Sequence, residues 1–380
     1  MSALDWLVIL AYLAVMLYIG YHSMKTVKTD EDFVLAGRNV GNIYIILSLF
    51  ASFTGLSGLF GTPQYVYEYG IAGWWWWATF PIGVFIMGMT MAKLLRRRMH
   101  VTLPDVVDVN HSSKAVRVAA SLVTVWNYLA WTAGQVAGIV LVITTFTDLN
   151  GTAAVIVAYI IIVLFTLLGG FRAVVYTDSL QAVLFLVVLG LVIPAVLLLH
   201  YDVPEALGSN HFYRRILQAF WQCARRNYDY LVAPGSRRFL LITWPCSGYL
   251  RPRTRKSAKG NITAAFLLMI IFGLILMFIG IMARFILPAG SDPASAMLNL
   301  SQLVLPKGML GLLVAAFAGV AVSTASSTLL VCSSTLEQDV YSVLRNTGKE
   351  NAGLFFTGQP AVCGAGRTDR PGTGSESTQC

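Results

Sequence analysis

Long apolar runs separated by short basic loops make up most of the chain. A helix that crosses a bilayer needs about 20 predominantly apolar residues, and several runs here reach or approach that length. Their order predicts a polytopic bundle of membrane helices, with a shorter helix at 294–303 in the last loop. The predicted spans are 6–21, 42–67, 72–95, 116–146, 151–168, 179–200, 262–287 and 309–335.

The second predicted span is interrupted by a short segment rich in glycine and hydroxyl side chains. Residues 51–61 include three glycines and three serine or threonine residues. Each glycine weakens a helix by about 1 kcal/mol, and serine and threonine compete with the backbone for hydrogen bonds. A helix broken at mid-membrane is typical of a substrate or cation site in a secondary transporter, because its freed carbonyls need protein, a cavity or an ion. The same small residues also suit a close contact between helices, so this stretch alone leaves both interpretations open.

Composition and charge indicate a membrane protein rather than a nucleic-acid-binding protein. The chain has 380 residues, of which 56% are hydrophobic and 12% charged, and its formal charge is +9. The basic residues lie in short loops between apolar runs, as positive-inside topology predicts. Arg96, Arg97 and Arg98 are the strongest such mark and predict a cytoplasmic loop after the third span. We therefore expect a multi-pass protein of the plasma (cell inner) membrane with its N-terminus outside.

Motifs of enzymes are missing from the sequence. It contains no phosphate-binding Walker loop, no nucleophile elbow and no cysteine–histidine spacing of a zinc site. The five cysteines form no disulfide framework. We predict that the protein is not an enzyme, that it has no cofactor and that it binds no nucleic acid.

Polar side chains at membrane depth mark two further places. Trp131 and Gln135 are one helical turn apart in the fourth span and share a face. They predict either a substrate-facing surface or interhelical hydrogen bonds, worth roughly 0.6 kcal/mol a pair. Thr177 and Asp178 precede the sixth span, where they suit an ordinary helix N-cap. An acid at a cytoplasmic helix mouth also suits a role in guiding a leaving cation.

The last predicted span contains a cluster of hydroxyl side chains at 320–328. Hydroxyls at adjacent positions, with a free carbonyl three residues earlier, suit a small hard cation that prefers oxygen ligands. Serine and threonine side chains also hydrogen-bond to the preceding turn of their own helix. In a chain that also has a broken helix, the cluster favours a cation site.

The chain changes character after residue 205. Between Arg214 and Arg255 there are nine Arg residues and no Lys. The topology requires a crossing in this region, for which only a marginal segment near 228–249 is available. We divide the chain into N-terminal membrane helices 1–205, an anomalous Arg-rich segment 206–259, further membrane helices 260–346 and a disordered tail 347–380.

Three motifs resemble the sodium/solute symporter family, which contains proline, pantothenate and sugar symporters. They are Ser57-Gly58 in the interrupted span, GGFRAVVYTDSLQ from Gly169 to Gln181, and STASSTLLVCSS from Ser323 to Ser334, which Gln338-Asp339 follows. The likeness covers roughly 1–205 and 257–346. It implies an all-α, polytopic membrane bundle with the inverted-repeat, leucine-transporter-like fold, in which ten core helices follow one extra helix. As the sequence stands, the resemblance implies an incomplete second repeat.

The resemblance also implies a sodium site between the broken helix and the late hydroxyl-rich helix. Carried over by position, the ion would be bound by three backbone carbonyls and two hydroxyls, those of Phe53, Leu56, Val320, Ser323 and Thr324. An unwound turn and one helix face would lie toward the solute, with the residues Thr54, Gly55, Ser57, Gly58, Trp131 and Gln135. Asp178 would stand at the exit of the cation.

Two departures from the family pattern bear on the solute. Proline-type members commonly carry an acid at the position of Gly55, and sugar-type members carry a polar residue at that of Phe60. A sugar is therefore disfavoured, and the expected solute is an amino acid, a carboxylate or a vitamin-like small molecule.

The predicted function is sodium-coupled secondary active transport, in which a small organic solute is imported by alternating access. The alternative is a non-transporting truncated remnant, or a membrane sensor or scaffold module of the same family. The Arg-rich segment, and the further helices that the family has after the position of residue 346, motivate this alternative.

Overall fold

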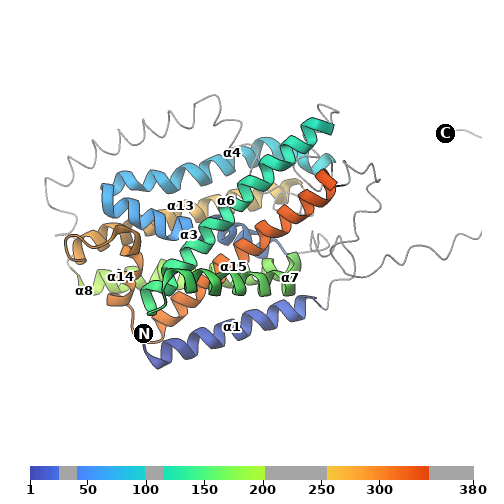
Figure 1. Ribbon diagram of the computed structural model, residues 1–380. Helices are drawn as coiled ribbons and strands as arrows, with labels where there is room; N and C mark the ends of the chain where they lie inside the picture. The colour runs from blue at the N-terminus through green and yellow to red at the C-terminus, as the bar shows by residue number, and fades with distance from the viewer. Residues whose placement is uncertain (25–40, 99–113, 202–254, 342–380) are drawn as a thin grey trace, which may run out of the picture.

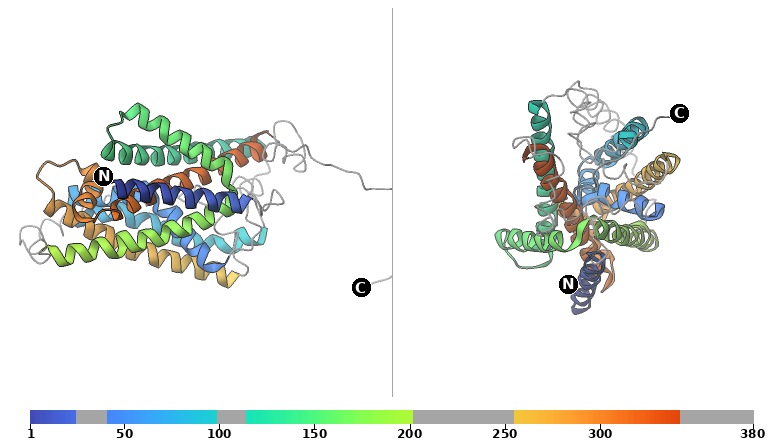
Figure 2. Two further views of the ribbon diagram at one scale, coloured as in Figure 1. Left: turned by 90° about the horizontal axis from the view of Figure 1, so that it is seen from below. Right: turned by 90° about the vertical axis from the view of Figure 1, so that its right-hand side faces the viewer.

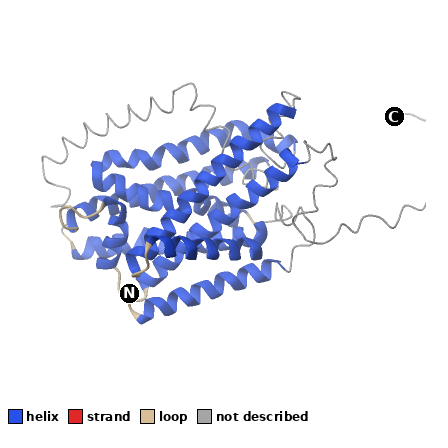
Figure 3. Cartoon of the chain, in the orientation of Figure 1, coloured by secondary structure: helices blue, strands red, loops and turns tan. Residues whose placement is uncertain are grey.

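A computed structural model describes residues 1–24, 41–98, 114–201 and 255–341, and the regular secondary structure in these ranges is helical (Figure 3). Six segments are long and apolar enough to cross a membrane, and one of them, Asn42–Thr90, contains two helices. The predicted all-α, multi-pass architecture is therefore confirmed. The elements are α1 (Ala3–Met24), α3 (Asn42–Tyr69), η2 (Gly70–Trp74), α4 (Trp75–Arg98), α6 (Lys114–Phe146), α7 (Gly151–Val187), η3 (Val188–Val192), α8 (Ile193–His200), α13 (Arg255–Ile286), η4 (Pro293–Ser295), α14 (Ala296–Val304), α15 (Met309–Thr335) and η5 (Leu336–Tyr341).

The helices lie lengthwise beside one another and begin and end at two opposite ends of the bundle (Figures 1 and 2). The N-terminus, the end of α8 and the short helix α14 lie at one end, and the starts of α6 and α13 lie at the other. α8 therefore ends and α13 begins at opposite ends of the bundle. The marginal span predicted near 228–249 and the predicted tail 347–380 lie outside the described residues.

The predicted fifth and sixth spans are joined in the structure. α7 continues as a helix through the glycine pair at 169–170, and α7 and α8 together run to one end of the bundle and return (Figure 2). Thr177 and Asp178 therefore lie inside a helix, and the N-cap role predicted for them is wrong. The Thr177 hydroxyl donates to the Val174 carbonyl of its own helix at 3.0 Å.

The long helices pack in two groups. α13 lies along α3 and α4, whereas α15 lies along α6 and α7, with α1 packed against α7 and α15. We call these the α3 group (α3, α4 and α13) and the α15 group (α1, α6, α7 and α15). α3 also packs against α7, α15 and α6, and the rings of Phe60 and Phe317 meet between α3 and α15 with centroids 4.9 Å apart. The broken helix therefore lies where the two groups meet.

A buried tryptophan holds the α3 group together. Trp77 is 3% exposed, and its indole Nε1 donates to the Met269 carbonyl of α13 at 3.0 Å. A Cβ atom on Gly58 would lie 2.3 Å from the Trp77 ring, and one on Gly273 would lie 2.2 Å from it. Trp77 is the last of four consecutive tryptophans, residues 74–77, and such a run is typical of an aromatic belt at the headgroup boundary. Its ring fills a slot that glycines on two other helices leave open, while Trp76 is 49% exposed.

The first helix is attached to the start of α15. One Asp5 carboxylate oxygen accepts the backbone N–H groups of Gly308 at 2.7 Å and Gly311 at 3.0 Å. The other accepts the Ser2 backbone N–H and hydroxyl, each at 2.7 Å. An acid at a helix N-terminus complements the helix dipole, so Asp5 fixes α1 within the α15 group.

Candidate functional site

α3 breaks inside the segment where the sequence predicts an interruption. Gly55 has φ 42° and ψ 165°, a conformation that glycine adopts without the strain of a side chain. The helical hydrogen-bond ladder is interrupted there, so groups on both sides need other partners. The Leu56 N–H donates to Oε1 of Gln135 on α6 at 3.1 Å, and Gln135 is fully buried. α6 therefore fixes the point at which α3 resumes.

Trp131 and Gln135 form one wall of the break. A Cβ atom on Gly55 would lie 3.4 Å from Nε2 of Gln135 and 3.6 Å from the Trp131 ring. Trp131 also stacks on Phe80 of α4, with ring centroids 6.0 Å apart and an interplanar angle of 23°. The structure thus brings Gly55, Trp131 and Gln135 together.

Asp178 joins the broken helix to the hydroxyl-rich helix. Its carboxylate is 1% exposed. One oxygen accepts the hydroxyls of Ser48 at 2.8 Å and Ser52 at 2.9 Å, both on α3. The other oxygen accepts the hydroxyl of Ser323 on α15. One acid of α7 is therefore hydrogen-bonded to both of the segments that the sequence singles out.

A buried carboxylate among hydroxyls is an unusual feature of a membrane helix. Ionisable groups at membrane depth are costly, so they commonly mark ion or substrate pathways. A hydroxyl that donates its proton to a carboxylate keeps its lone pairs for another partner. The Ser323 hydroxyl can therefore donate to Asp178 and still present oxygen lone pairs to a cation.

The hydroxyls of α15 divide into two kinds. Those of Ser327 and Thr328 donate to carbonyls one turn earlier in α15, at 3.0 Å and 3.1 Å, which is the ordinary bonding pattern of such side chains in a helix. The Thr328 hydroxyl also lies 2.6 Å from that of Thr132 on α6. The Thr324 hydroxyl is buried and has no hydrogen-bond partner among the described residues. It is the member of the cluster that still needs a partner.

The other predicted residues are placed as follows. Three residues are predicted to bind sodium through their backbone carbonyls, and they lie in buried parts of α3 and α15: Phe53, Leu56 and Val320. The Thr54 hydroxyl donates to a carbonyl of its own helix at 2.6 Å. Ser57 is partly buried. Gly58 lies against the Trp77 ring.

Ser48 and Ser52 are site residues that were not predicted from the sequence. They are four positions apart on the first half of α3 and therefore share one helix face. Two hydroxyls at that spacing in an apolar run are a usable signal. They lie outside the glycine-rich segment, however, and the sequence does not show which side chain they meet.

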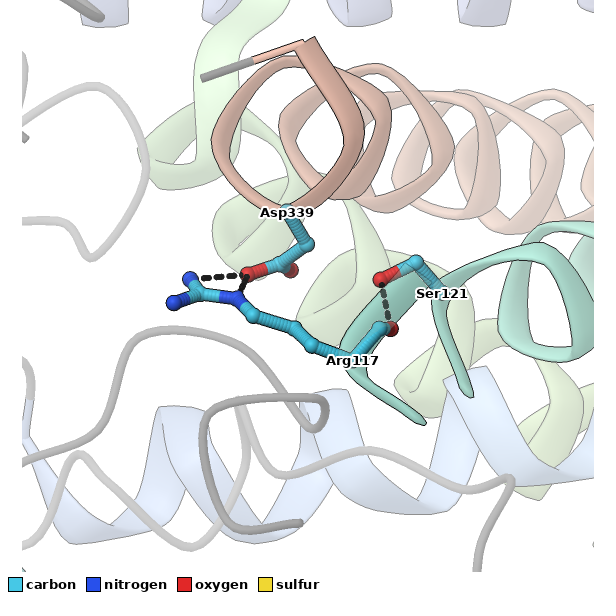
Figure 4. A network of polar contacts seen from close by, with 3 residues as sticks. All are labelled: Arg117, Ser121 and Asp339. Atoms are coloured by element: carbon cyan, nitrogen blue, oxygen red, sulfur yellow. Dashed lines mark hydrogen bonds and ion pairs between the residues drawn. The ribbon is translucent and has the colours of Figure 1, made fainter. Parts of the chain in front are cut away.

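A buried ion pair links α6 to η5, which directly follows α15. The Arg117 guanidinium contacts one Asp339 oxygen through Nε at 3.0 Å and Nη2 at 2.5 Å (Figure 4). The Ser121 hydroxyl donates to the Arg117 carbonyl at 2.8 Å. The Arg117 and Asp339 side chains are 10% and 0% exposed. Asp339 belongs to one of the three family-like motifs, and in the structure it pairs with α6.

In a multi-pass bundle, a discontinuous helix that faces a hydroxyl-rich helix is typical of a secondary transporter, and this is the class of protein that the fold indicates. The model of the sodium:solute symporter family matches residues 33–223 and 252–356. The chain therefore belongs to the sodium:solute symporter family, and it is a sodium-coupled symporter rather than an enzyme. Residues 224–251, within the Arg-rich segment, are not part of that match.

Curated relatives and a solved structure agree with this assignment. The sodium/proline symporter 2 of Staphylococcus saprophyticus is 27% identical over 375 residues, which cover 91% of this chain and 70% of that protein. The sodium/proline symporter of Staphylococcus aureus is 26% identical over 376 residues, with the same coverage. A substrate-bound, outward-open Na⁺-coupled sialic acid symporter matches with a TM-score of 0.73 at 19% identity, covering 90% of this chain and 74% of that one. The leucine-transporter-like fold is thereby confirmed, and the non-transporting alternative is not favoured.

Proposed function

We propose that the coupling sodium ion binds where the break in α3 faces α15. Its ligands would be the carbonyls and hydroxyls carried over from the family, those of Phe53, Leu56, Val320, Ser323 and Thr324. The main support is the Thr324 hydroxyl, because a buried hydroxyl without a partner costs about 1–3 kcal/mol unless something binds it. Carbonyl and hydroxyl oxygens are the ligands that small hard cations prefer.

Asp178 would lie beside this site, and the cation would pass it on its way out. Its carboxylate is hydrogen-bonded to Ser323, one of the proposed ligands. A negative charge next to the ion lowers the cost of holding a cation in a low-dielectric interior. The hydroxyls of Ser48 and Ser52 would follow Asp178 as further oxygen ligands along the route of exit.

The solute would bind on the other side of the break, beside Gly55, Trp131 and Gln135. It would be a small organic molecule such as an amino acid, a carboxylate or a vitamin-like compound. We propose that the protein imports it across the plasma membrane, with the N-terminus outside. Alternating access would arise from movement of the α3 group against the α15 group around the site.

Uptake by proteoliposomes that contain the full chain tests this function. Candidate radiolabelled solutes, beginning with proline because the relatives are sodium/proline symporters, are supplied outside in sodium chloride or in choline chloride. We expect uptake that requires an inward sodium gradient. Uptake that proceeds equally in choline would refute sodium coupling. Sodium-dependent thermal stabilisation without uptake of any solute would instead support the remnant alternative.

A further inference from the structure

A cavity between α1, α3 and α7 is distinct from the proposed sodium and solute sites. Its volume is about 530 Å³, within the range of about 300–1,000 Å³ that is usual for small-ligand pockets. α1 and α3 both pack along α7, and the cavity lies between these three helices. The Ser179 hydroxyl of α7 donates to the Tyr44 carbonyl of α3 at 3.3 Å, which joins two of its walls.

One end of this cavity lies where three apolar spans begin or end. These spans are Ala3–Ser23, Asn42–Thr90 and Val174–His200. His22, Tyr44 and Tyr176 line the cavity, and each lies within one turn of such a boundary. The end of a membrane-spanning apolar run lies at the headgroup region of the bilayer, so we call this the headgroup end of the cavity. α1 runs to it from the N-terminus (Figure 2), and in the proposed topology it is the cytoplasmic side.

Polar or amphipathic side chains line the cavity at the headgroup end, and apolar side chains line it one turn deeper. The pairs are His22 and Ile19 on α1, Tyr44 and Leu47 on α3, and Tyr176 and Leu180 on α7. α1 runs toward this end and α3 runs away from it, so the same order of polarity arises on helices of opposite direction. A lining that changes from polar to apolar with depth matches an amphiphile whose headgroup lies at the bilayer surface.

Two aromatic pairs frame the headgroup end. The Tyr18 ring stacks on that of His22 with centroids 6.1 Å apart, and the rings of Tyr44 and Tyr176 meet edge-on at 5.2 Å. Tyrosine has an apolar body and a polar tip, which suits the boundary between hydrocarbon and water. Phenol hydroxyls and imidazole N–H groups donate hydrogen bonds, so a headgroup with several acceptor oxygens fits this end.

The cavity is open to the surroundings of the bundle. Tyr18, Tyr44 and Val183 line it and are exposed. In a bundle that crosses a membrane, exposed side chains at this depth face lipid, so a lipid reaches the cavity directly from the bilayer. Lys114 and Lys259 lie near the starts of α6 and α13, at the same end of the bundle, and basic residues there attract anionic lipid headgroups.

We propose that this cavity binds a phospholipid, with one acyl chain beside Leu47 and Leu180 and the phosphate group at the His22 end. A soluble anion would leave the apolar part of the lining unfilled. A lipid without a phosphate group would leave fewer acceptors for the donors that three different helices supply. The site is independent of sodium and of the transported solute.

A matched set of short-chain amphiphiles tests this site. The purified full chain is heated in detergent and choline chloride with dioctanoylphosphatidylglycerol, dioctanoylglycerol, octanoate or inorganic phosphate. Apparent affinities follow from the rise in melting temperature with ligand concentration. We expect the phospholipid to bind at least about tenfold more tightly than dioctanoylglycerol, the effect of one hydrogen bond to a charged group. Octanoate and inorganic phosphate should bind more weakly than the phospholipid.

Three outcomes of these melts would overturn the proposal. The first is the absence of any shift with the phospholipid. The second is an equal affinity for dioctanoylglycerol, which would mean that the phosphate is not bound. The third is tighter binding of octanoate, which would assign the cavity to free fatty acids. Because sodium and solute are absent, none of these results bears on the proposed transport function, and a failure of sodium-coupled uptake would leave the lipid site standing.

Two pairs of variants locate the effect. Leu180→Trp fills the deeper part of the cavity and should weaken phospholipid binding by about tenfold, since it excludes about two methylene groups of the chain. Ile160→Trp, at an exposed position of the same helix, is its control and should not change binding. His22→Leu should reduce the preference for the phospholipid over dioctanoylglycerol, whereas His200→Leu, exposed at the opposite end of the bundle, should not. If Leu180→Trp lowers the melting temperature without lipid, the exposed His22 pair decides; an undiminished preference in His22→Leu would refute the assigned headgroup end.

Discussion

The Thr324 hydroxyl allows the sodium site to be distinguished from a purely structural cluster. Thr324 is 4% exposed, and its hydroxyl has no hydrogen-bond partner among the described residues. Thr324→Val replaces that hydroxyl with a methyl group of similar size. If the hydroxyl is a sodium ligand, the substitution should affect the sodium-free and the sodium-bound protein in opposite directions.

The expected changes in stability and in sodium affinity follow from the burial of the Thr324 hydroxyl. An unsatisfied buried hydroxyl costs about 1–3 kcal/mol, so removing it should raise the stability of the sodium-free protein by up to that amount. An interaction with a charged partner contributes about 1.5–3 kcal/mol, so its loss should raise the half-saturating sodium concentration by roughly tenfold to a hundredfold. Damage to the fold in general would lower both stability and sodium affinity.

Thermal unfolding of the full chain over a series of sodium chloride concentrations, with choline chloride to hold ionic strength constant, measures both quantities. Stabilisation by a ligand that binds only the folded state rises with the logarithm of its concentration relative to Kd. Thr144→Val is the matched control, because it removes an exposed hydroxyl on α6. It should change neither the stability of the sodium-free protein nor its sodium affinity. A Thr324→Val protein with the sodium response of the unsubstituted chain would show that the hydroxyl does not contact sodium.

Three further substitutions test the sodium site and the helix contacts around it. Ser323→Ala should raise the half-saturating sodium concentration and also lower stability by about 1 kcal/mol, because Asp178 loses a hydroxyl donor; unchanged sodium dependence in melts would count against Ser323 as a ligand. Gly58→Ala should lower the free energy of unfolding by about 1–3 kcal/mol, since its Cβ would lie 2.3 Å from the Trp77 ring. Gly134→Ala is the control and should be neutral or stabilising, because its Cβ would have no atom within 4 Å. Equal unfolding free energies for the two variants would contradict this. Asp339→Leu should lower the free energy of unfolding by about 3–5 kcal/mol, because it removes the carboxylate that the buried Arg117 guanidinium binds, and Arg117→Leu in the same chain should recover most of this loss, as measured by denaturant unfolding. No recovery in the double variant would indicate that the pair fixes the helix ends rather than merely balancing charge.

The membrane spans and the broken helix are predictable because their signals are local. A run of about 20 apolar residues has few alternatives to a membrane helix, and α15 has the bounds that the sequence predicts, Met309–Thr335. The break at Gly55 lies where glycine and hydroxyl residues together weaken the helix. These features depend on the cost of unpaired backbone groups in hydrocarbon, which short stretches of sequence reveal.

The errors concern residues whose roles depend on distant partners. Asp178 resembles an N-cap in its local sequence, but Ser48, Ser52 and Ser323, which its carboxylate binds, are 130, 126 and 145 positions away. Trp77 belongs to a run that is typical of an interfacial belt. Its burial depends on a glycine in α13, Gly273, for which the sequence near Trp77 contains no signal.

The hydrogen bonds that cross between the two helix groups suggest how ion and solute would be coupled. In the α15 group, Gln135 and Asp178 accept hydrogen bonds from α3, and Ser179 donates one to it. The proposed sodium ligands come from α3 and α15, so the ion would bind well only while the two groups are together. The proposed solute site likewise combines Gln135 of the α15 group with Gly55 of α3. Two ligands that prefer the same arrangement must raise each other's affinity by the same factor. The apparent Kd for a transported solute, tested first with proline, should therefore fall as the sodium concentration rises. A Kd independent of sodium would mean that the two sites do not share this contact between the groups.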